Sequence, residues 1–334
     1  MIDKKDYSLL KHNTFGIEAK CKRFIEFSTV DEAVEVAKML TEADQPLLIL
    51  GGGSNLLLTK DYEGTVVHSA ISYIKKVDNC RVCCGSGYVF DDLVAYCVEH
   101  QLYGAENLSI IPGEVGASAV QNIGAYGVEA KDFIEDVEAV ELATGKVVHF
   151  KNEDCQYSYR QSKFKQAWRD KYLITSVTYR FSTTYEPKLD YGNIRSALVS
   201  KGITDPTANQ LREVIIEVRN AKLPDPEVLG NAGSFFMNPI VAKTKYEELA
   251  AQYENMPHYT IDATHEKIPA GWLIEQCGWK GKALGRAAVH DKQALVLVNR
   301  GGATGEEVVT LCKTIQNDVK NKFGIEIFPE VNIK

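Results

Sequence analysis

The sequence lacks any long apolar run. No stretch approaches the roughly 20 consecutive apolar residues that a membrane-spanning helix needs. Residues 1–6 are mostly polar, and no apolar segment follows them of the kind that a secretory signal contains. We therefore expect a cytoplasmic protein with no membrane partner.

An excess of basic residues is also missing. The 334 residues include 38 Lys and Arg against 45 Asp and Glu, which gives a net charge of −7. Proteins that bind nucleic acid or anionic membranes in general need a basic surface. The balance argues against both classes, but it leaves room for an anionic small molecule in a local basic pocket.

Metal-binding spacing is absent as well. The tightest group among the eight cysteines is Cys80-x-x-Cys83-Cys84, and no second pair stands at a suitable distance for zinc. We expect structural thiols and no metal site. The seven histidines are scattered and none pairs with a nucleophile motif, so no acid–base role is predicted for them.

The elements that are present indicate a mixed α/β chain of two or three domains. Thr29-x-x-Glu32 and Thr207-x-x-Gln210 are capping boxes that predict helix starts, and Thr304 is predicted to cap a helix over 306–323 that Gly324 ends. The remaining predictions are helices at 89–100 and 270–277, a hairpin over 136–150 with its turn at 143–146, and strands at 47–50, 173–181, 294–299 and 325–333.

Two glycine-rich segments stand out. The first, 51–55, reads Gly-Gly-Gly-Ser-Asn and directly follows the predicted strand 47–50. Glycines let backbone N–H groups approach an anion closely, and Ser54 and Asn55 add side-chain donors. The segment is neither a G-x-G-x-x-G dinucleotide fingerprint nor a P-loop. A phosphate cradle and a tight turn both remain open.

The second segment, 111–127, carries Gly113, Gly116, Gly124 and Gly127 among Ser118, Gln121 and Asn122. It is too rich in glycine to predict a stable helix and too apolar for a disordered linker. A buried loop needs partners for its backbone polar groups, which a large polar cofactor could supply. A packed structural loop is an equally good interpretation of the composition.

A resemblance to a known family rests on motifs that occur in order along the whole chain. Together with the two glycine segments, these are Asn13-Thr-Phe-Gly16, Tyr159-Arg160-x-Ser162, Lys222-Leu-Pro-Asp-Pro226, Gly230-Asn-Ala-Gly-Ser-Phe-Phe-Met-Asn-Pro239, Ala270-Gly-Trp-Leu-Ile274, Ala287-Ala-Val-His290 and Phe328-Pro-Glu-Val331. The chain resembles the UDP-N-acetylenolpyruvoylglucosamine reductase family over about residues 12–333. Tyr191-Gly192 is similar to the tyrosine loop of its type I branch.

The resemblance implies an α+β protein with a two-subdomain FAD-binding fold of the vanillyl-alcohol-oxidase type and a C-terminal α+β substrate-binding domain. The implied boundaries are 1–69 with 325–334, 70–224 and 225–324. The implied enzyme is a UDP-N-acetylmuramate dehydrogenase of peptidoglycan synthesis, with non-covalent FAD, NADPH as co-substrate and UDP-N-acetylglucosamine enolpyruvate as substrate. Hydride would pass from flavin N5 to C3 of the enolpyruvyl group. A monomer is expected.

Three residues match the family's catalytic positions. By this match Ser234 donates the proton to C2, Arg160 binds the substrate carboxylate and stabilises developing charge, and Glu330 assists at the reacting carbon. Without the match, Ser234 would be interpreted as a helix N-cap and the other two as surface charges.

The implied binding residues form two sets. Those for substrate are Lys222, Tyr191, Asn238, Gln293, Tyr126 and, as a weaker prediction, Arg219. Those for FAD are Gly51, Gly52, Gly53, Ser54, Asn55, Leu56, Ile111, Pro112, Gly113, Gly116, Ala117, Ser118, Val120, Gln121, Asn122, Gly124 and Ile174.

Three other hypotheses compete with the reductase. One is another flavin enzyme of the same fold, such as a lactone or hydroxy-acid oxidase, which would share the FAD-binding part but not the 230–239 string. Another is a catalytically silent UDP-sugar-binding protein, which predicts loss of Ser234, Arg160 or Glu330, although all three are present. The last is a structural α/β protein whose glycine segments are turns.

Overall fold

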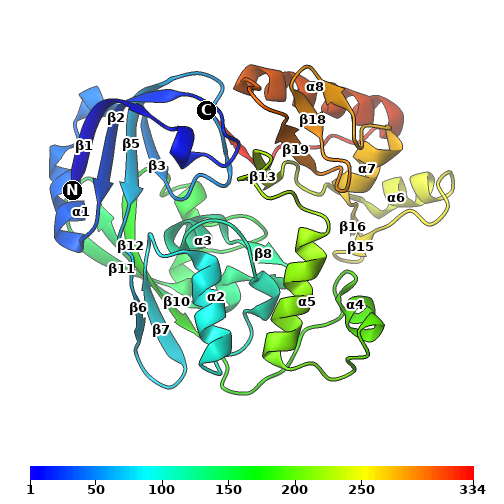
Figure 1. Ribbon diagram of the computed structural model, residues 1–334, viewed down its shortest axis with the longest axis horizontal. Helices are drawn as coiled ribbons and strands as arrows, with labels where there is room; N and C mark the ends of the chain where they lie inside the picture. The colour runs from blue at the N-terminus through cyan, green and yellow to red at the C-terminus, as the bar shows by residue number, and fades with distance from the viewer. The chain divides into compact units, whose positions relative to one another are not determined.

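The computed structural model describes residues 1–334, which form two compact units (Figure 1). Unit 1 comprises Met1–Tyr7, Cys21–Gly53 and Glu63–Arg219, and unit 2 comprises Ser8–Lys20, Ser54–Tyr62 and Asn220–Lys334. The chain thus passes between the units several times. The finer three-domain division expected from the sequence stays a prediction.

Unit 1 begins with a four-stranded sheet in the order β1-β2-β5-β3. Its strands are β1 (Ile2–Ser8), β2 (Lys20–Phe27), β3 (Leu47–Leu50) and β5 (Tyr62–Ser69), and β3 runs parallel to β5. Helix α1 (Val30–Met39) packs against this sheet through Val36, which is buried with Ile25 and Val67. Thr29 caps α1 as predicted, because its side chain accepts a hydrogen bond from the Glu32 N–H.

A five-stranded antiparallel sheet in the order β11-β10-β12-β7-β6 forms the rest of the unit 1 framework. Its strands are β6 (Ile74–Lys76), β7 (Arg81–Gly85), β10 (Ile134–Glu141), β11 (Val147–Lys151) and β12 (Tyr172–Arg180). Helices α2 (Phe90–Glu99) and α3 (Val115–Gln121) share its buried core, to which Val94, Ala119 and Val177 contribute. The predicted hairpin over 136–150 is confirmed by the β10–β11 pairing.

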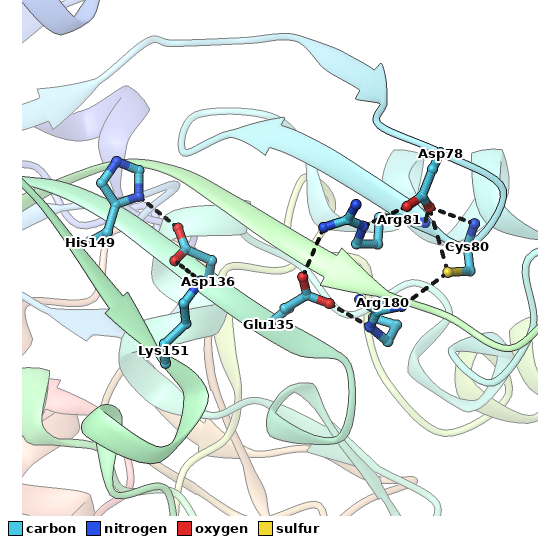
Figure 2. Close-up of polar contacts among 8 residues, drawn as sticks. All are labelled: Asp78, Cys80, Arg81, Glu135, Asp136, His149, Lys151 and Arg180. Carbon is cyan, nitrogen blue, oxygen red and sulfur yellow. Dashed lines mark hydrogen bonds and ion pairs between the residues drawn. The ribbon is translucent and has the colours of Figure 1, made fainter.

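Polar side chains cover part of this sheet (Figure 2). Glu135 lies between Arg81 and Arg180 and forms an ion pair with each, and the Arg180 Nη1 group donates to Cys80 Sγ over 3.2 Å. Asp136, the next residue of β10, binds both His149 and Lys151 of β11. Arg180, His149 and Lys151 are more than half exposed, so solvent screens their ion pairs and these pairs contribute little to stability.

The last helices of unit 1 are α4 (Ile194–Ser200) and α5 (Ala208–Asn220). Their apolar faces form a separate cluster in which Leu198 and Ile215 are buried. The predicted capping box before α5 is confirmed in both directions: the Thr207 N–H donates to Gln210 Oε1 over 2.9 Å, and the Gln210 N–H donates to Thr207 Oγ1 over 3.2 Å.

Unit 2 contains a four-stranded sheet in the order β13-β19-β18-β17, a three-stranded sheet in the order β14-β16-β15, and a parallel pair of β4 with β20. The bounds are β4 (Leu56–Leu57), β13 (Asn231–Ser234), β14 (Ile240–Ala242), β15 (Tyr259–Thr260), β16 (His265–Lys267), β17 (Ala283–Leu284), β18 (Ala287–Val289), β19 (Val296–Asn299) and β20 (Asn332–Ile333). Its helices are α6 (Lys243–Ala250), α7 (Ala270–Gln276) and α8 (Gly305–Phe323).

An N-terminal segment, Ser8–Lys20, belongs to unit 2. Thr14 Oγ1 donates to the Asn231 carbonyl over 2.6 Å, and Asn299 Nδ2 donates to the Phe15 carbonyl over 3.0 Å. Side-chain bonds to backbone therefore fix this segment on strands β13 and β19, more than 200 residues further along the chain.

Short elements complete the chain. A small antiparallel pair, β8 (Gly124–Ala125) with β9 (Val128–Glu129), lies at the end of the second glycine segment. Six short 3₁₀ turns occur at Leu10–His12, Glu42–Asp44, Glu106–Leu108, Ala130–Asp132, Asn152–Cys155 and Lys163–Lys165. None of the helices combines the length and the apolar character that crossing a membrane requires.

Two expectations from the sequence are wrong. The run 111–127 was expected to form no helix, yet Val115–Gln121 forms α3, because buried Val115 and Ala119 anchor it in the core and Asn122 ends it in the left-handed region. The tail 325–333 was expected to be one strand, but only Asn332–Ile333 is. The residues before β20 bind β13 and its extension through single contacts, such as the Phe236–Pro329 bridge.

The cap of α8 gives a test of the fold. The Thr304 side chain accepts from the Glu307 N–H, and the Glu307 carboxylate accepts from the Thr304 N–H in return. Thr304→Ala should lower the free energy of unfolding by about 1 kcal/mol and move the urea midpoint down. The control is Thr314→Ala, a half-buried position in the middle of the same helix. Equal midpoints for the two variants would contradict the assigned cap.

Candidate functional site

The first glycine segment emerges from strand β3. Gly53 has φ +67°, in the left-handed region where glycine carries no steric cost, and Gly52 is exposed. The chain then enters unit 2, where Asn55 Nδ2 donates to the Glu330 carbonyl over 3.4 Å and the Asn332 N–H donates to the Asn55 carbonyl over 3.1 Å. Asn55 and Leu56, both predicted cofactor residues, are thus tied to the C-terminal tail.

The two glycine segments adjoin each other within unit 1. A Cβ atom built on Gly51 would lie 3.0 Å from Ala117 Cβ, and one built on Gly52 would lie 3.5 Å from Gly113 Cα. A side chain at Gly51 or Gly52 would therefore occupy the space between the first and second glycine segments. The structure therefore brings together the predicted residues Gly51, Gly52, Gly113 and Ala117, with bare backbone on both sides.

Helix α3 holds the second segment against strand β7 and its extension. The Gly116 N–H donates to the Ser86 carbonyl over 2.8 Å, and a Cβ on Gly116 would lie only 2.8 Å from Ser86 Cβ. Ser118 Oγ bonds to the Val115 carbonyl and lies 2.8 Å from the hydroxyl of buried Tyr179.

Several other predicted cofactor residues serve the fold of unit 1. Asn122 joins the segment to its neighbours, since its Nδ2 donates to the Ser158 carbonyl and its Oδ1 accepts from the Lys131 N–H. Ile174 is a buried residue of β12. Ile111, Pro112, Val120 and Gln121 lie in or beside the same segment, and their contact with a cofactor stays a prediction.

Arg160 lies over the end of the second segment. Its Nη2 group donates to the Gly124 carbonyl over 2.7 Å, and Lys165 Nζ donates to the Arg160 carbonyl over 2.8 Å. The backbone of Arg160 has φ +57°, a conformation that is uncommon outside glycine and asparagine. A half-buried guanidinium is therefore fixed beside the β8–β9 turn.

Tyr126, Tyr191 and Arg219 form a second group in unit 1. A Cβ on Gly127 would lie 3.5 Å from the Tyr191 ring, and one on Gly192 would lie 3.6 Å from the Tyr126 ring. Arg219 has a buried Nε without a hydrogen-bond partner. Burial lowers the pKa of Arg219, while the neighbouring Tyr126 acts in the opposite direction. Burial also raises the pKa of Tyr126.

Ser234 and Glu330 lie on adjoining segments of unit 2. Ser234 is an exposed residue at the end of β13, paired with Val296 of β19, so the alternative interpretation as a helix N-cap is wrong. The next residue, Phe235, accepts a hydrogen bond from the Glu330 N–H over 2.8 Å through its carbonyl. The backbone thus brings the tail that carries Glu330 to the residue after Ser234.

The other predicted substrate residues of unit 2 are placed around the same sheet. Asn238 Oδ1 accepts from the Ala270 N–H over 2.9 Å at the start of α7. Gln293 Oε1 accepts from the Leu295 N–H over 3.3 Å. Lys222 is exposed just after α5.

Some residues beside these groups carry no signal in the sequence. Asn107 holds Tyr126 in place, because its Nδ2 donates to the Tyr126 carbonyl over 2.9 Å and to the Lys188 carbonyl over 3.0 Å. His68 lies between Glu26 and Glu114 in unit 1. The contacts of Asn107 and His68 can be recognised only in the folded chain.

Two family models match parts of this chain. The family model described as "UDP-N-acetylenolpyruvoylglucosamine reductase, C-terminal domain" matches residues 225–334, and the one described as "FAD binding domain" matches residues 21–151. A solved UDP-N-acetylenolpyruvylglucosamine reductase from Thermus caldophilus superimposes with a TM-score of 0.68 over 99% of this chain and 98% of that one. At 21% identity this likeness supports the fold alone.

Curated sequences extend the similarity to the whole chain. A UDP-N-acetylenolpyruvoylglucosamine reductase of Bacteroides fragilis (strain YCH46) is 54% identical over 330 residues, which cover 98% of both chains. One of Porphyromonas gingivalis (strain ATCC BAA-308 / W83) is 45% identical over 332 residues, again 98% of both. With its α+β fold and its FAD-binding domain, this chain belongs to the UDP-N-acetylenolpyruvoylglucosamine reductase family.

Proposed function

We propose that this chain reduces UDP-N-acetylglucosamine enolpyruvate to UDP-N-acetylmuramate with NADPH in peptidoglycan synthesis. The observation that carries the proposal is the identity of 54% to a curated reductase across 98% of both chains. A competing oxidase of the same fold would have no reason to match the reductase family model at residues 225–334.

The residues of unit 1 fit the FAD that the family requires. Gly51, Gly52 and Gly113 have no side chains that would hold an anion away from their backbone, and a side chain added at Gly51 would not fit beside Ala117 without displacement. Such side-chain-free backbone is typical of phosphate sites. These residues would hold the FAD diphosphate, with Ser54, Asn55 and the remaining predicted cofactor residues on the two segments.

When bound, FAD would supply hydride transfer from NADPH to C3 of the enolpyruvyl group. The chain's own residues must then manage charge and protons. Hydride addition leaves negative charge at C2 and on the substrate carboxylate. Arg160 would bind that carboxylate with its guanidinium, which the Gly124 carbonyl orients from one side.

Ser234 would deliver the proton to C2. A serine hydroxyl is a weak acid, so it must be held within hydrogen-bond reach of a strongly basic carbon. The strand pairing of Ser234 with Val296 and the contact between the Glu330 N–H and the Phe235 carbonyl support such placement. Glu330 would orient groups at the reacting carbon or assist proton delivery.

The nucleotide sugar would bind through the remaining residues. Lys222 is a compact exposed cation suited to the diphosphate. Tyr191 would cover the nucleotide, and Asn238 and Gln293 would hydrogen-bond the sugar. Tyr126 and Arg219 would face the substrate near the flavin. The buried Nε of Arg219 without a partner supports this role, because such a donor needs an acceptor.

The contact of Gly116 with Ser86 gives a test of the cofactor segment. Gly116→Ala places a methyl group 2.8 Å from Ser86 Cβ, so α3 must shift and FAD retention should fall about tenfold or more. The measurement is the dissociation constant of FAD from flavin fluorescence. Adding Ser86→Gly removes the clashing carbon and should recover part of the affinity. Unchanged affinity in Gly116→Ala would count against the placement of FAD beside α3.

Ser234→Ala tests the proton donor. Flavin binding and bleaching by NADPH should stay near normal, whereas anaerobic recovery of the flavin band after adding the enolpyruvate should slow by roughly 10²–10⁴-fold. The control is Ser196→Ala, on an exposed position of α4. Near-normal recovery in Ser234→Ala would remove Ser234 from its role.

The wild-type spectrum provides the reference for both half-reactions. If NADPH bleaches the flavin but the enolpyruvate fails to restore it, the fold and the cofactor stand and the substrate assignment is wrong. If no flavin band is present even after FAD is added, the proposed role of the glycine segments is wrong.

A further inference from the structure

His68 lies between two carboxylates next to the first glycine segment. Its Nδ1 is 2.9 Å from Glu26 Oε2 of β2, and its Nε2 is 3.1 Å from Glu114 Oε1, just before α3. The His68 side chain is 12% exposed and Glu114 is 15% exposed. We call these three residues the Glu26–His68–Glu114 bracket.

The bracket requires a charged imidazole. A neutral imidazole has one N–H and can donate to one carboxylate only, whereas both ring nitrogens here face carboxylate oxygens. Burial acts to lower the pKa of His68, but the hydrogen bonds and charges of Glu114 and Glu26 outweigh it, and the pKa is raised above 6.5. With His68 protonated the bracket carries a net charge of about −1, and without that proton about −2.

Glu114 connects the bracket to the proposed cofactor site. Its Oε2 lies 3.4 Å from the position of a Cβ on Gly51, and its Oε1 lies 3.6 Å from that of a Cβ on Gly52. The carboxylate therefore lies against the backbone that is proposed to hold the FAD diphosphate. An unneutralised carboxylate there would repel the diphosphate, and the repulsion is strong in a partly buried site.

We propose that His68 is a positioning residue for FAD. As an imidazolium it hydrogen-bonds both Glu26 and Glu114, and it thereby neutralises the Glu114 carboxylate that lies beside Gly51 and Gly52. The inference rests on the proposed cofactor placement. Glu26 from β2 and Glu114 from the segment before α3 face the His68 ring, and the uncharged Phe24 ring of β2 lies at 6.4 Å. Leu50, its partner in β3, is apolar.

The sign of the pH dependence follows from the raised pKa. At pH 6.5 and below, most of the imidazole is protonated because its pKa is raised above 6.5, and the proton is lost as pH rises through the pKa of the folded protein. Loss of the proton removes one positive charge, which changes the net charge of the bracket from about −1 to about −2 beside the diphosphate. The affinity for FAD should therefore fall with rising pH, by roughly three- to tenfold between pH 6.5 and 9.

The experiment measures FAD release from the full-length flavoprotein on dilution, followed by flavin fluorescence at constant ionic strength from pH 6 to 9. Wild type should release FAD more readily as pH rises. Glu114→Gln should bind FAD more tightly than wild type at pH 9, and the midpoint of its pH dependence should move to lower pH because His68 keeps only Glu26 as a partner. His68→Asn should bind FAD weakly at every pH, near the wild-type value at pH 9. The double variant should bind FAD more tightly than His68→Asn and show no pH dependence.

His149→Asn is the matched control. His149 also faces two carboxylates, with Nδ1 2.8 Å from Asp136 and Nε2 3.7 Å from Glu138, but it lies exposed on the five-stranded sheet (Figure 2). Its loss should leave FAD release unchanged at every pH. Glu26→Gln provides a second test that does not touch Glu114, and it should move the midpoint of the pH dependence to lower pH.

The outcomes separate the inference from the proposed function. Tight FAD binding without pH dependence in wild type, or an unchanged pH dependence in Glu114→Gln or Glu26→Gln, would refute the role of His68 and leave the reductase assignment intact. Failure of wild type to bind FAD at any pH would refute the cofactor placement itself.

Discussion

The proposed cofactor site depends on close contact between segments of backbone that carry no side chains. A Cβ on Gly64 of β5 would lie 1.8 Å from the Pro46 carbonyl oxygen, at the start of β3, and one on Gly116 would lie 2.8 Å from Ser86 Cβ. The first contact fixes the strand from which 51–53 emerges, and the second fixes the helix that follows Gly113. Both glycine segments are therefore held at their ends by packing that any larger residue would disrupt.

The sequence could predict those parts of the fold that depend on residues close to one another in the chain. Helix starts at Thr29, Thr207 and Thr304 were predicted because a cap involves residues only three positions apart. Strand β12 was predicted because polar and apolar residues alternate over 176–181, which covers its second half. Signals of this kind lie within a short window and do not depend on distant parts of the chain.

The two wrong predictions, for helix α3 and for the tail 325–333, concern segments whose structure is determined by contacts with distant parts of the chain. Glycine lowers helix propensity, and four glycines in 111–127 argued against a helix, but α3 gains its stability from the burial of Val115 and Ala119 in the core of the five-stranded sheet. The tail before Asn332 has an apolar pattern typical of a strand. The Glu330 N–H finds its partner at the Phe235 carbonyl instead, a single contact that no local pattern predicts.

The candidate site follows the same division. Its glycine segments were visible as composition, whereas the predicted roles of Arg160, Ser234 and Glu330 came from family resemblance alone. The Glu26–His68–Glu114 bracket could not be found from sequence, because its members are 42 and 46 residues apart and only Glu114 lies in a segment that the sequence singles out. A scattered histidine gains significance only when the fold shows what faces each ring nitrogen.

Two histidines of this chain illustrate how burial sets that significance. His68 and His149 each lie between two carboxylates, yet their side chains are 12% and 57% exposed. Around His149, water and salt screen the charges, so its ion pairs contribute little. Around His68 the charges are partly removed from water, and their balance acts on whatever binds nearby. Backbone N–H groups can attract a diphosphate beside Glu114 only if the negative charge of that carboxylate is neutralised. A protonated His68 supplies the positive charge that neutralises it.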